Sequence, residues 1–317
     1  MLNIQENISL AKYTTFRIGG PARFFVEVEN AEEIAEAIEY AQNNKFKFFI
    51  LGGGCNVLVS DSGFDGLVIR IKNTLFMIHD VSVGCGAGVP LAKVVKDSIE
   101  SGLTGMEWAA GIPGTVGGAI RGNAGAFGGE MAQGINTVNF IDPAELYEED
   151  NKTVKIKTFS AADCQFAYRN SIFKQNPNLI ILSASLRLEK GDRAESEKKV
   201  KDILAQRSSN QPKGASAGSY FINPVVSNPE LLAEFEKETG QKSRGGKLPS
   251  GWLIARAGLR GKKIGGALVS MEHANFIVNT GTATAEDITA LDSLVKQQVR
   301  DKFGVQLQEE VQYLGFN

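Results

Sequence analysis

The chain contains 317 residues, with 34 lysines and arginines against 36 aspartates and glutamates, and its net charge is −2 at pH 7. This balance gives no electrostatic reason to expect binding to nucleic acid or to an anionic membrane surface. No apolar run approaches the roughly 20 residues that a membrane helix needs. The first residues lack the basic and apolar regions of a signal peptide, so we expect a cytoplasmic protein with no membrane partner.

Cysteine and histidine are too scarce to build a disulfide framework or a metal centre. The three cysteines, Cys55, Cys85 and Cys164, are odd in number, lie far apart and form no CxxC pair. This spacing disfavours structural zinc and stabilising disulfides. The only histidines are His79 and His273, so we expect no metal ion.

The segment 111–129, GIPGTVGGAIRGNAGAFGG, is unusual because eight of its residues are glycine. A helix loses about 1 kcal/mol of stability for each interior glycine relative to alanine. A flexible linker would carry polar residues rather than the apolar Ile112, Val116 and Phe127. We therefore expect an ordered loop whose backbone closely approaches another group and offers N–H donors to an anion. A phosphate cradle is favoured over the alternative, tight packing of backbone on backbone at a sheet corner.

The N-terminal part of the chain alternates strand and helix patterns. Hydrophobic periodicity predicts a strand over 22–28, a helix over 31–44 and a buried strand over 46–51. Asn30 is placed to cap the helix, and Glu33 stands at the position that a capping box would use. This pattern indicates one helix packed on a sheet.

A second glycine loop, Gly52-Gly53-Gly54, follows the buried strand. The residues 57–61 after it read as another strand. A Rossmann unit requires a strand, a glycine loop and a helix in that order, so this pattern argues against a Rossmann fold. The loop still supplies backbone donors for a phosphate, and a glycine-rich hairpin is the alternative.

The remaining elements follow from periodicity and turn residues. A helix over 90–101 follows the glycine-rich segment 84–88, which we interpret as structural because its spacing is not that of a dinucleotide loop. A charged helix over 193–208 is expected to connect two domains, with its charges in solvent. Further strands are predicted at 65–70, 80–83, 137–142, 153–159, 179–189, 275–279 and 307–315, and further helices at 228–240, 250–259 and 285–304.

Six motifs occur together in a recognisable order. They are GGGCNVLVSD at 52–61, GIPGTVGGAIRGNAGAFGGE at 111–130, FAYRNS at 166–171, GSYFINP at 218–224, GWLIARAGLRGKKIGGALVSMEHANFIVN at 251–279 and EEVQYLG at 309–315. The combination resembles the UDP-N-acetylenolpyruvoylglucosamine reductase family, and the resemblance extends over almost the whole chain.

The resemblance implies an α+β fold, with a two-lobed FAD-binding region of the vanillyl-alcohol-oxidase type and a C-terminal α+β substrate domain. The expected boundaries are 1–65 and 66–205 for the two FAD-binding lobes and 206–317 for the substrate domain. Arg169 and Ser219 lie 50 residues apart, a spacing similar to that of the family branch without an extra substrate-covering loop. We expect a monomer.

The family's reaction implies non-covalently bound FAD that is reduced by NADPH as co-substrate. Reduced flavin N5 then delivers a hydride to the enolpyruvyl double bond of UDP-N-acetylglucosamine enolpyruvate, which gives UDP-N-acetylmuramate for peptidoglycan synthesis. By motif match, Arg169, Ser219 and Glu310 act on this UDP-sugar substrate.

The chemistry of this reaction suits these three residue types. A guanidinium stabilises negative charge on the substrate and its carboxylate. Glu310 would be protonated or paired with Arg169. Ser219 would donate the proton, although a hydroxyl is a poor acid.

The resemblance also implies the binding residues. Those expected to contact FAD, mostly through backbone groups, are Gly52, Gly53, Gly54, Cys55, Asn56, Gly111, Ile112, Pro113, Gly114, Thr115, Gly118 and Gly125. Those expected to contact the substrate are Tyr168, Asn223, His273 and Asn275.

Three residues depart from the family pattern. Cys55 stands in place of a serine, which removes a hydroxyl contact to phosphate. Ala167 stands in place of a glycine, and its methyl group would shift Arg169 if the backbone of Ala167 needed a positive φ. Ile222 stands where a polar or basic residue is common, which weakens the case for diphosphate binding there.

Other functions are kept as alternatives. The first is a different FAD-dependent oxidase of the same fold that acts on a sugar or alcohol. Covalent flavin attachment, as in some such oxidases, is disfavoured because neither His79 nor His273 lies in the glycine loops. A non-enzymatic flavin or nucleotide-binding module is motivated by the three departures but disfavoured by the retained catalytic residue types. A Ser–His hydrolase is disfavoured because Ser219 lies in AGSYF, which is not G-x-S-x-G.

Overall fold

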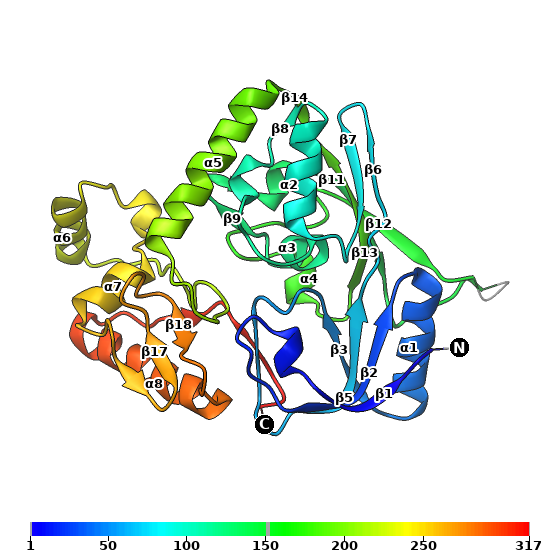
Figure 1. The fold of residues 1–317 in the computed structure, drawn as a ribbon, viewed down its shortest axis with the longest axis horizontal. Coiled ribbons are helices and arrows are strands. Elements are labelled where there is room, and N and C mark those ends of the chain that lie inside the picture. Colours follow the sequence, from blue (N-terminus) through cyan, green and yellow to red (C-terminus); the bar gives the residue numbers. More distant parts are fainter. Residues whose placement is uncertain (1, 150–152, 317) are drawn as a thin grey trace. The chain divides into compact units, whose positions relative to one another are not determined.

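The computed structural model describes residues 2–149 and 153–316, which form two compact units (Figure 1). The first unit comprises Met1–Ile8, Ala22–Gly54 and Asp65–Ser209, and the second comprises Ser9–Pro21, Cys55–Phe64 and Asn210–Asn317. Both units mix helices with separate sheets, as expected for an α+β fold. The units are assembled from discontinuous segments, whereas the expected boundaries at 65 and 205 follow chain order. Those three-domain boundaries therefore stay a prediction.

The first unit contains a four-stranded sheet with one helix packed beside it. Its elements are β1 (Gln5–Ser9), β2 (Pro21–Val28), α1 (Ala31–Asn43), β3 (Lys47–Leu51) and β5 (Phe64–Ile71). The strand order is β1-β2-β5-β3, and β3 runs parallel to β5. The predicted cap of α1 is confirmed, because the Asn30 side chain accepts a hydrogen bond from the N–H of Glu33 at 2.8 Å. Glu33 in turn accepts from the N–H of Glu29, not of Asn30, at 2.7 Å.

The larger part of the first unit is built on a five-stranded antiparallel sheet. Its main elements are β6 (Phe76–His79), β7 (Ser82–Gly86), α2 (Leu91–Glu100), α3 (Val116–Arg121), β11 (Ile135–Ile141), β12 (Ile156–Ser160), β13 (Ile180–Arg187) and α5 (Arg193–Asn210). Its short elements are β8 (Leu103–Thr104), β9 (Gly125–Ala126), β10 (Gly129–Glu130), α4 (Ile172–Gln175) and β14 (Glu189–Lys190). The strand order is β12-β11-β13-β7-β6, and α3 packs on β13 and β7 (Figure 1).

The strand predicted over 80–83 is confirmed only from Ser82, where β7 begins, because Asp80 and Val81 form a hairpin turn. Asp80 adopts φ 51° and separates β6 from β7. The glycine-rich segment 84–88, expected to be a loop before a helix, starts inside β7 and pairs with β13. A Cβ atom on Gly86 would lie 2.4 Å from the carbonyl oxygen of Asn73. Glycine is therefore required here by backbone packing, which agrees with the structural interpretation of this segment.

The second unit packs three helices around small sheets. Its elements are β4 (Val57–Val59), β15 (Phe221–Ile222), α6 (Pro229–Thr239), α7 (Ser250–Arg256), β16 (Lys263–Ile264), β17 (Ala267–Val269), β18 (Ile277–Asn279), α8 (Ala285–Phe303), β19 (Gln308–Glu309) and β20 (Gln312–Leu314). Thr284 and Asp287 form a capping box at the start of α8, which ends at the left-handed Gly304. Within the described ranges, no helix is both long and apolar enough to span a membrane.

Strand β4 pairs in a way that local sequence patterns do not reveal. It runs parallel to β20, with Val57 opposite Gln312. The second glycine loop is therefore not a hairpin, although the predicted order of strand, glycine loop and strand is confirmed. The single strand predicted over 307–315 is two short strands, and Glu310 lies in the break between them.

Candidate active site

The two glycine loops of the first unit meet at the start of α3. Gly52 follows β3, and Thr115 is the N-cap residue of α3. A Cβ atom on Gly52 would lie 2.7 Å from Oγ1 of Thr115. This hydroxyl is buried and has no hydrogen-bond partner among the described residues. Since buried polar atoms are usually paired, an unpaired hydroxyl between two glycine loops is consistent with a polar ligand at this position.

The glycines of the segment 111–129 fall into two groups. Those in the first group pack against the protein itself: a Cβ atom would lie 2.9 Å from Cβ of Ala87 at Gly117 and 2.2 Å from the Trp108 side chain at Gly129. Gly118 is different, because it is exposed and its Cβ atom would meet only Thr115 Oγ1, at 3.8 Å. Tight packing of the backbone therefore explains Gly117 and Gly129, whereas the open position of Gly118 agrees with a phosphate cradle.

The motif FAYRNS forms a tight turn that presents Arg169. Ala167 and Asn170 exchange two backbone hydrogen bonds of 3.0 Å across the turn. The left-handed conformation falls on Arg169, at φ 55°, and not on Ala167. The condition under which the Ala167 methyl group would shift Arg169, a positive φ at Ala167, is therefore not met. Holding a non-glycine residue in this region costs on the order of 1–3 kcal/mol, and such strain is common at functional sites.

Hydrogen bonds attach this turn to the glycine segment. Nη2 of Arg169 donates to the carbonyl oxygen of Gly125 at 2.8 Å. Asn123 donates from Nδ2 to the carbonyl oxygen of Ala167 at 3.0 Å, and Ser171 donates to that of Arg121 at 2.7 Å. Arg169 is half-buried and its guanidinium lies 5.3 Å from the ring centre of the exposed Tyr168. The structure thus brings together the predicted catalytic arginine and the predicted cofactor segment.

Ser219 and Glu310 belong to the second unit, where the backbone joins their segments. The N–H of Glu310 donates to the carbonyl oxygen of Tyr220, the residue after Ser219, at 2.8 Å. Asn56 donates from Nδ2 to the carbonyl oxygen of Glu310 at 3.1 Å. Ser219 and Glu310 are both half-buried. Asn56, predicted to contact FAD, therefore also supports the backbone of Glu310.

Asn275 supports the same segment from the other side. Its Oδ1 accepts from the N–H of Phe221 at 3.0 Å, its Nδ2 donates to the carbonyl oxygen of Phe221 at 2.9 Å, and its own carbonyl accepts from Tyr220 at 2.7 Å. The side chain is buried. These bonds make Asn275 a structural clamp, and substrate contact by this residue stays a prediction.

His273 and Asn223 also bond to neighbouring backbone. Nδ1 of His273 accepts from the N–H of Asn275 at 3.2 Å, and burial lowers the pKa of the imidazole, which favours the neutral form. Oδ1 of Asn223 accepts from the N–H of Ser250 at 3.0 Å. Substrate contacts by His273 and Asn223 stay predictions.

Comparison with known proteins identifies the family. A family model described as an FAD binding domain matches residues 22–156, and one described as the C-terminal domain of UDP-N-acetylenolpyruvoylglucosamine reductase matches residues 210–314. The UDP-N-acetylenolpyruvoylglucosamine reductase of Solibacter usitatus is 36% identical, over 99% of this chain and 97% of its own length. The chain belongs to the UDP-N-acetylenolpyruvoylglucosamine reductase family.

Other reductases are also similar to this chain along nearly their full length. That of Synechococcus sp. strain CC9311 is 39% identical over 99% of this chain and 94% of its own length. The crystal structure of the reductase from Thermus caldophilus is 30% identical, with a TM-score of 0.75 over 99% of this chain and 100% of the other. The resemblance identified from six sequence motifs is thus confirmed as family membership.

The structure shows the surroundings of Cys55 and Ile222, two residues that differ from the usual reductase motifs. Burial raises the pKa of the Cys55 thiol to about 11, so this side chain is neutral at neutral pH. Ile222 lies in β15 opposite Gln308, and its carbonyl oxygen accepts from the Ser250 hydroxyl at 2.7 Å. Neither residue offers the hydroxyl or cation that the reductase pattern usually places there.

A partly buried polar network adjoins the segments of Ser219 and Glu310 and was not predicted from the sequence; Tyr220 and Asp292 are its buried members. The hydroxyl groups of Tyr220 and Tyr313 are 2.8 Å apart, and Tyr313 donates to Oδ2 of Asp292 at 3.1 Å. Lys296 lies 2.9 Å from the same carboxylate oxygen and also pairs with Glu309. Because Tyr220 and Glu309 are the immediate neighbours of Ser219 and Glu310, the network stabilises the backbone that carries both predicted catalytic residues.

Asp292 in this network should make the stability of the reductase depend on pH. Burial raises the pKa of its carboxyl from 3.8 to about 6. A raised pKa means that the folded state holds the proton more tightly than the unfolded chain. The Asp292 contribution to stability therefore increases as pH falls through 6, and it is complete below 3.8.

We expect the Asp292→Asn variant to lack this contribution. The melting temperature of the wild type should rise relative to that of Asp292→Asn between pH 7.5 and pH 5, measured by calorimetry. Asp301→Asn, at an exposed position on the same helix, is the control and should show no such trend. Parallel pH profiles for wild type and Asp292→Asn would contradict the assignment.

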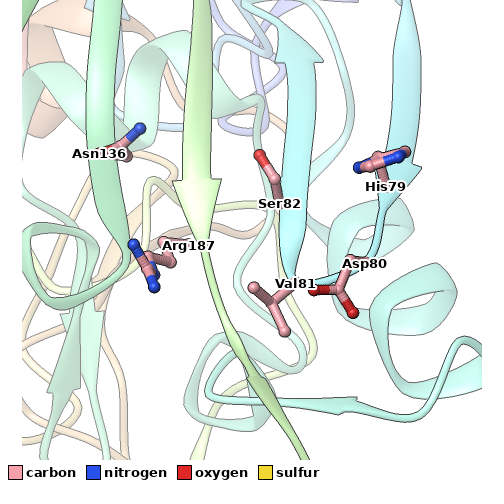
Figure 2. Close-up of a pocket in the computed structure, with 6 residues that line it drawn as sticks. All are labelled: His79, Asp80, Val81, Ser82, Asn136 and Arg187. Carbon is pink, nitrogen blue, oxygen red and sulfur yellow. The ribbon is translucent and has the colours of Figure 1, made fainter.

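The first unit has an open hollow, whose lining residues are drawn in Figure 2. It has a volume of about 320 Å³ and lies at the ends of β6, β7, β11 and β13. Its lining contains none of the predicted site residues and consists of His79, Asp80, Val81, Ser82, Asn136 and Arg187. Lys190 already pairs with Asp80 at 2.9 Å, and both side chains are largely exposed. We assign no function to this hollow.

Proposed function

We propose that this protein reduces UDP-N-acetylglucosamine enolpyruvate to UDP-N-acetylmuramate in bacterial peptidoglycan synthesis, with FAD as a non-covalent cofactor and NADPH as co-substrate. The observation that carries the proposal is 36% identity to a named reductase over 99% of the chain, with Arg169, Ser219 and Glu310 in the matching motifs. The alternative of an oxidase acting on a sugar or alcohol finds no support in this family membership.

The residues of the two glycine loops fit FAD. The unpaired hydroxyl of Thr115 offers a polar partner for a nucleotide, and the open side of Gly118 leaves room for one. We propose that these loops, from Gly52 to Asn56 and from Gly111 to Gly125, hold FAD mainly through backbone N–H groups. Bound FAD supplies the hydride carrier between NADPH and the enolpyruvyl double bond.

We assign the substrate chemistry to three side chains. The guanidinium of Arg169, whose Nη2 is held by Gly125, orients the enolpyruvyl carboxylate and stabilises the negative charge that develops beside it. Glu310 orients this group in its protonated form or with its charge balanced by a cation. Ser219 donates the proton that completes the lactyl ether, and its fixed position compensates for the high pKa of a hydroxyl.

We further infer a cytoplasmic monomer of the family branch without an additional substrate-covering loop. The short spacing supports the branch assignment, because most of the residues between Arg169 and Ser219 are taken up by α4, β13, β14 and α5. Cytoplasmic location agrees with the use of a nucleotide-linked sugar and NADPH as substrates.

The spectrum of the purified protein tests the proposal directly. The protein should be yellow, NADPH should bleach the flavin absorbance under anaerobic conditions, and UDP-N-acetylglucosamine enolpyruvate should restore it. Absence of bleaching by both NADPH and NADH would rule the reductase out. Rapid peroxide formation with simple sugars would instead favour the oxidase.

We expect Gly52→Ala to weaken FAD binding about 10-fold or more. The new methyl group would lie 2.7 Å from Thr115 Oγ1 and would displace the unpaired hydroxyl that we propose contacts the cofactor. Overpacking at such a site costs about 1–3 kcal/mol. FAD release from the holoenzyme, followed by flavin fluorescence, measures the effect.

Gly134→Ala is a matched control, because its Cβ atom would meet only Leu186 and Leu188 at ordinary contact distances of 3.6 and 3.7 Å. Equal FAD release from the wild type and both variants would show that FAD binding does not depend on the Thr115 hydroxyl beside Gly52.

A further inference from the structure

Arg207, in the last turn of α5, lies against the start of the glycine segment. A Cβ atom on Gly111 would lie 2.8 Å from Cδ of Arg207 and 3.0 Å from Cδ2 of Leu204. Glycine at position 111 therefore allows the stem of Arg207 to lie directly on the backbone of the segment proposed to bind FAD. Gly111 itself adopts φ 74°, which independently favours glycine there.

The guanidinium of Arg207 faces an aromatic ring on the same glycine segment. Its Cζ atom lies 5.2 Å from the ring centre of Phe127. Phe127 and Gly128 form the two-residue turn between β9 and β10, with φ of 50° and 84°. Glycine or asparagine is the usual choice for such a turn, and a phenylalanine in this conformation is strained. The Phe127 side chain is nevertheless 45% exposed, so burial of the ring does not explain the strain.

Arg207 also lacks a countercharge. Its Nε atom is buried without a hydrogen-bond partner, and no carboxylate in the described part of the chain forms an ion pair with it. Burial lowers the pKa of Arg207, which reflects incomplete solvation of its charge. A favourable interaction with the dipole of α5 would explain a cation in the last turn. It would not explain a covered Nε, a stem packed on Gly111 or an exposed, strained Phe127.

We propose that Arg207, with its guanidinium over the ring of Phe127, binds a phosphoryl group of a nucleotide held by the glycine segment. Arginine suits this role because its planar guanidinium donates two parallel hydrogen bonds to phosphate and stacks on aromatic rings at the same time. This inference rests on the proposed function, in which FAD, NADPH and the UDP-sugar all carry a diphosphate. The substrate carboxylate is a separate anion, assigned to Arg169.

The test compares Arg207→Met and Arg207→Lys with the wild type. Methionine keeps an apolar stem and removes the charge, whereas lysine keeps the charge and loses the planar fork. Lys201→Met removes a cation from an exposed position of the same helix and is the control. Four quantities are measured: FAD release from the holoenzyme, and the KM values for NADPH, NADH and UDP-N-acetylglucosamine enolpyruvate.

We expect Arg207→Met to weaken the binding of one of these nucleotides about 10- to 100-fold, because hydrogen bonds to a charged group are lost. Arg207→Lys should recover part of the loss, and Lys201→Met should stay within about 2-fold of the wild type. Faster FAD release identifies the FAD diphosphate as the group that Arg207 binds. A larger rise in KM for NADPH than for NADH identifies the extra phosphate of NADPH, and a rise for the UDP-sugar alone identifies the substrate diphosphate.

Two results would overturn the proposal. One is that all four quantities match those of the Lys201→Met control. The other is equal loss in both Arg207 variants together with a lowered melting temperature, which would indicate a structural role. If the wild type shows no turnover, the proposed function fails, and FAD release together with NADP+ binding by calorimetry still decides the role of Arg207.

Discussion

Replacing Ser219 with alanine should reduce turnover about 10²- to 10⁴-fold, the range for loss of a positioned acid. FAD should stay bound and NADPH should still bleach the flavin at the wild-type rate, because the proposed cofactor loops lie in other segments of the chain. The step that slows should be reoxidation by the UDP-sugar, where the proton is needed. Stopped-flow absorbance measures the two half-reactions separately.

An exposed serine in the same unit provides a matched control for this experiment. Ser227→Ala removes a hydroxyl from an exposed position of the same unit and should leave both half-reactions unchanged. The bonds that hold the Ser219 segment come from neighbouring backbone and from Asn275, so removal of the hydroxyl should not unfold it. Wild-type reoxidation by Ser219→Ala would show that another group donates the proton.

Local sequence patterns predicted most elements because hydrophobic periodicity and capping act within a few residues of the chain. The cap of α1 at Asn30 and the long helix α8 are examples. The patterns did not predict strand partners. Parallel pairing of β4 with β20 joins residues that lie far apart in the sequence. Alternation of apolar residues shows that a strand exists but not which strand lies beside it.

The candidate site likewise contains some residues that local sequence patterns identified and others that they did not. Glycine density identified the two loops that meet at Gly52 and Thr115. The roles of Arg169, Ser219 and Glu310 came only from family resemblance, because single polar residues have no local signature. The sequence did hold one overlooked signal, since Asp292 falls four residues after Ile288 on the buried face of α8. A carboxylate at such a position requires partners, which the structure provides as Tyr313 and Lys296.

Replacing Arg169 with methionine should lower kcat/KM for the UDP-sugar about 10²- to 10³-fold, as for loss of a group that stabilises transition-state charge. Arg169→Lys should recover only part of this activity. Lysine retains the charge but cannot both bond to Gly125, as Nη2 of Arg169 does at 2.8 Å, and present a planar fork to a carboxylate. Steady-state kinetics with varied UDP-sugar measure both effects.

Backbone strain at Arg169 makes the choice of control important, because this residue adopts the left-handed conformation with φ 55°. Lys45 has the same φ of 55° and is exposed in the first unit. Lys45→Met therefore removes a cation from an equally unusual backbone position and should leave kcat/KM unchanged. If Arg169→Met and Lys45→Met behaved alike, strain alone would account for Arg169. A loss confined to the Arg169 variants, with FAD retained, would instead show that the turn holds its strained conformation in order to present the guanidinium to the substrate.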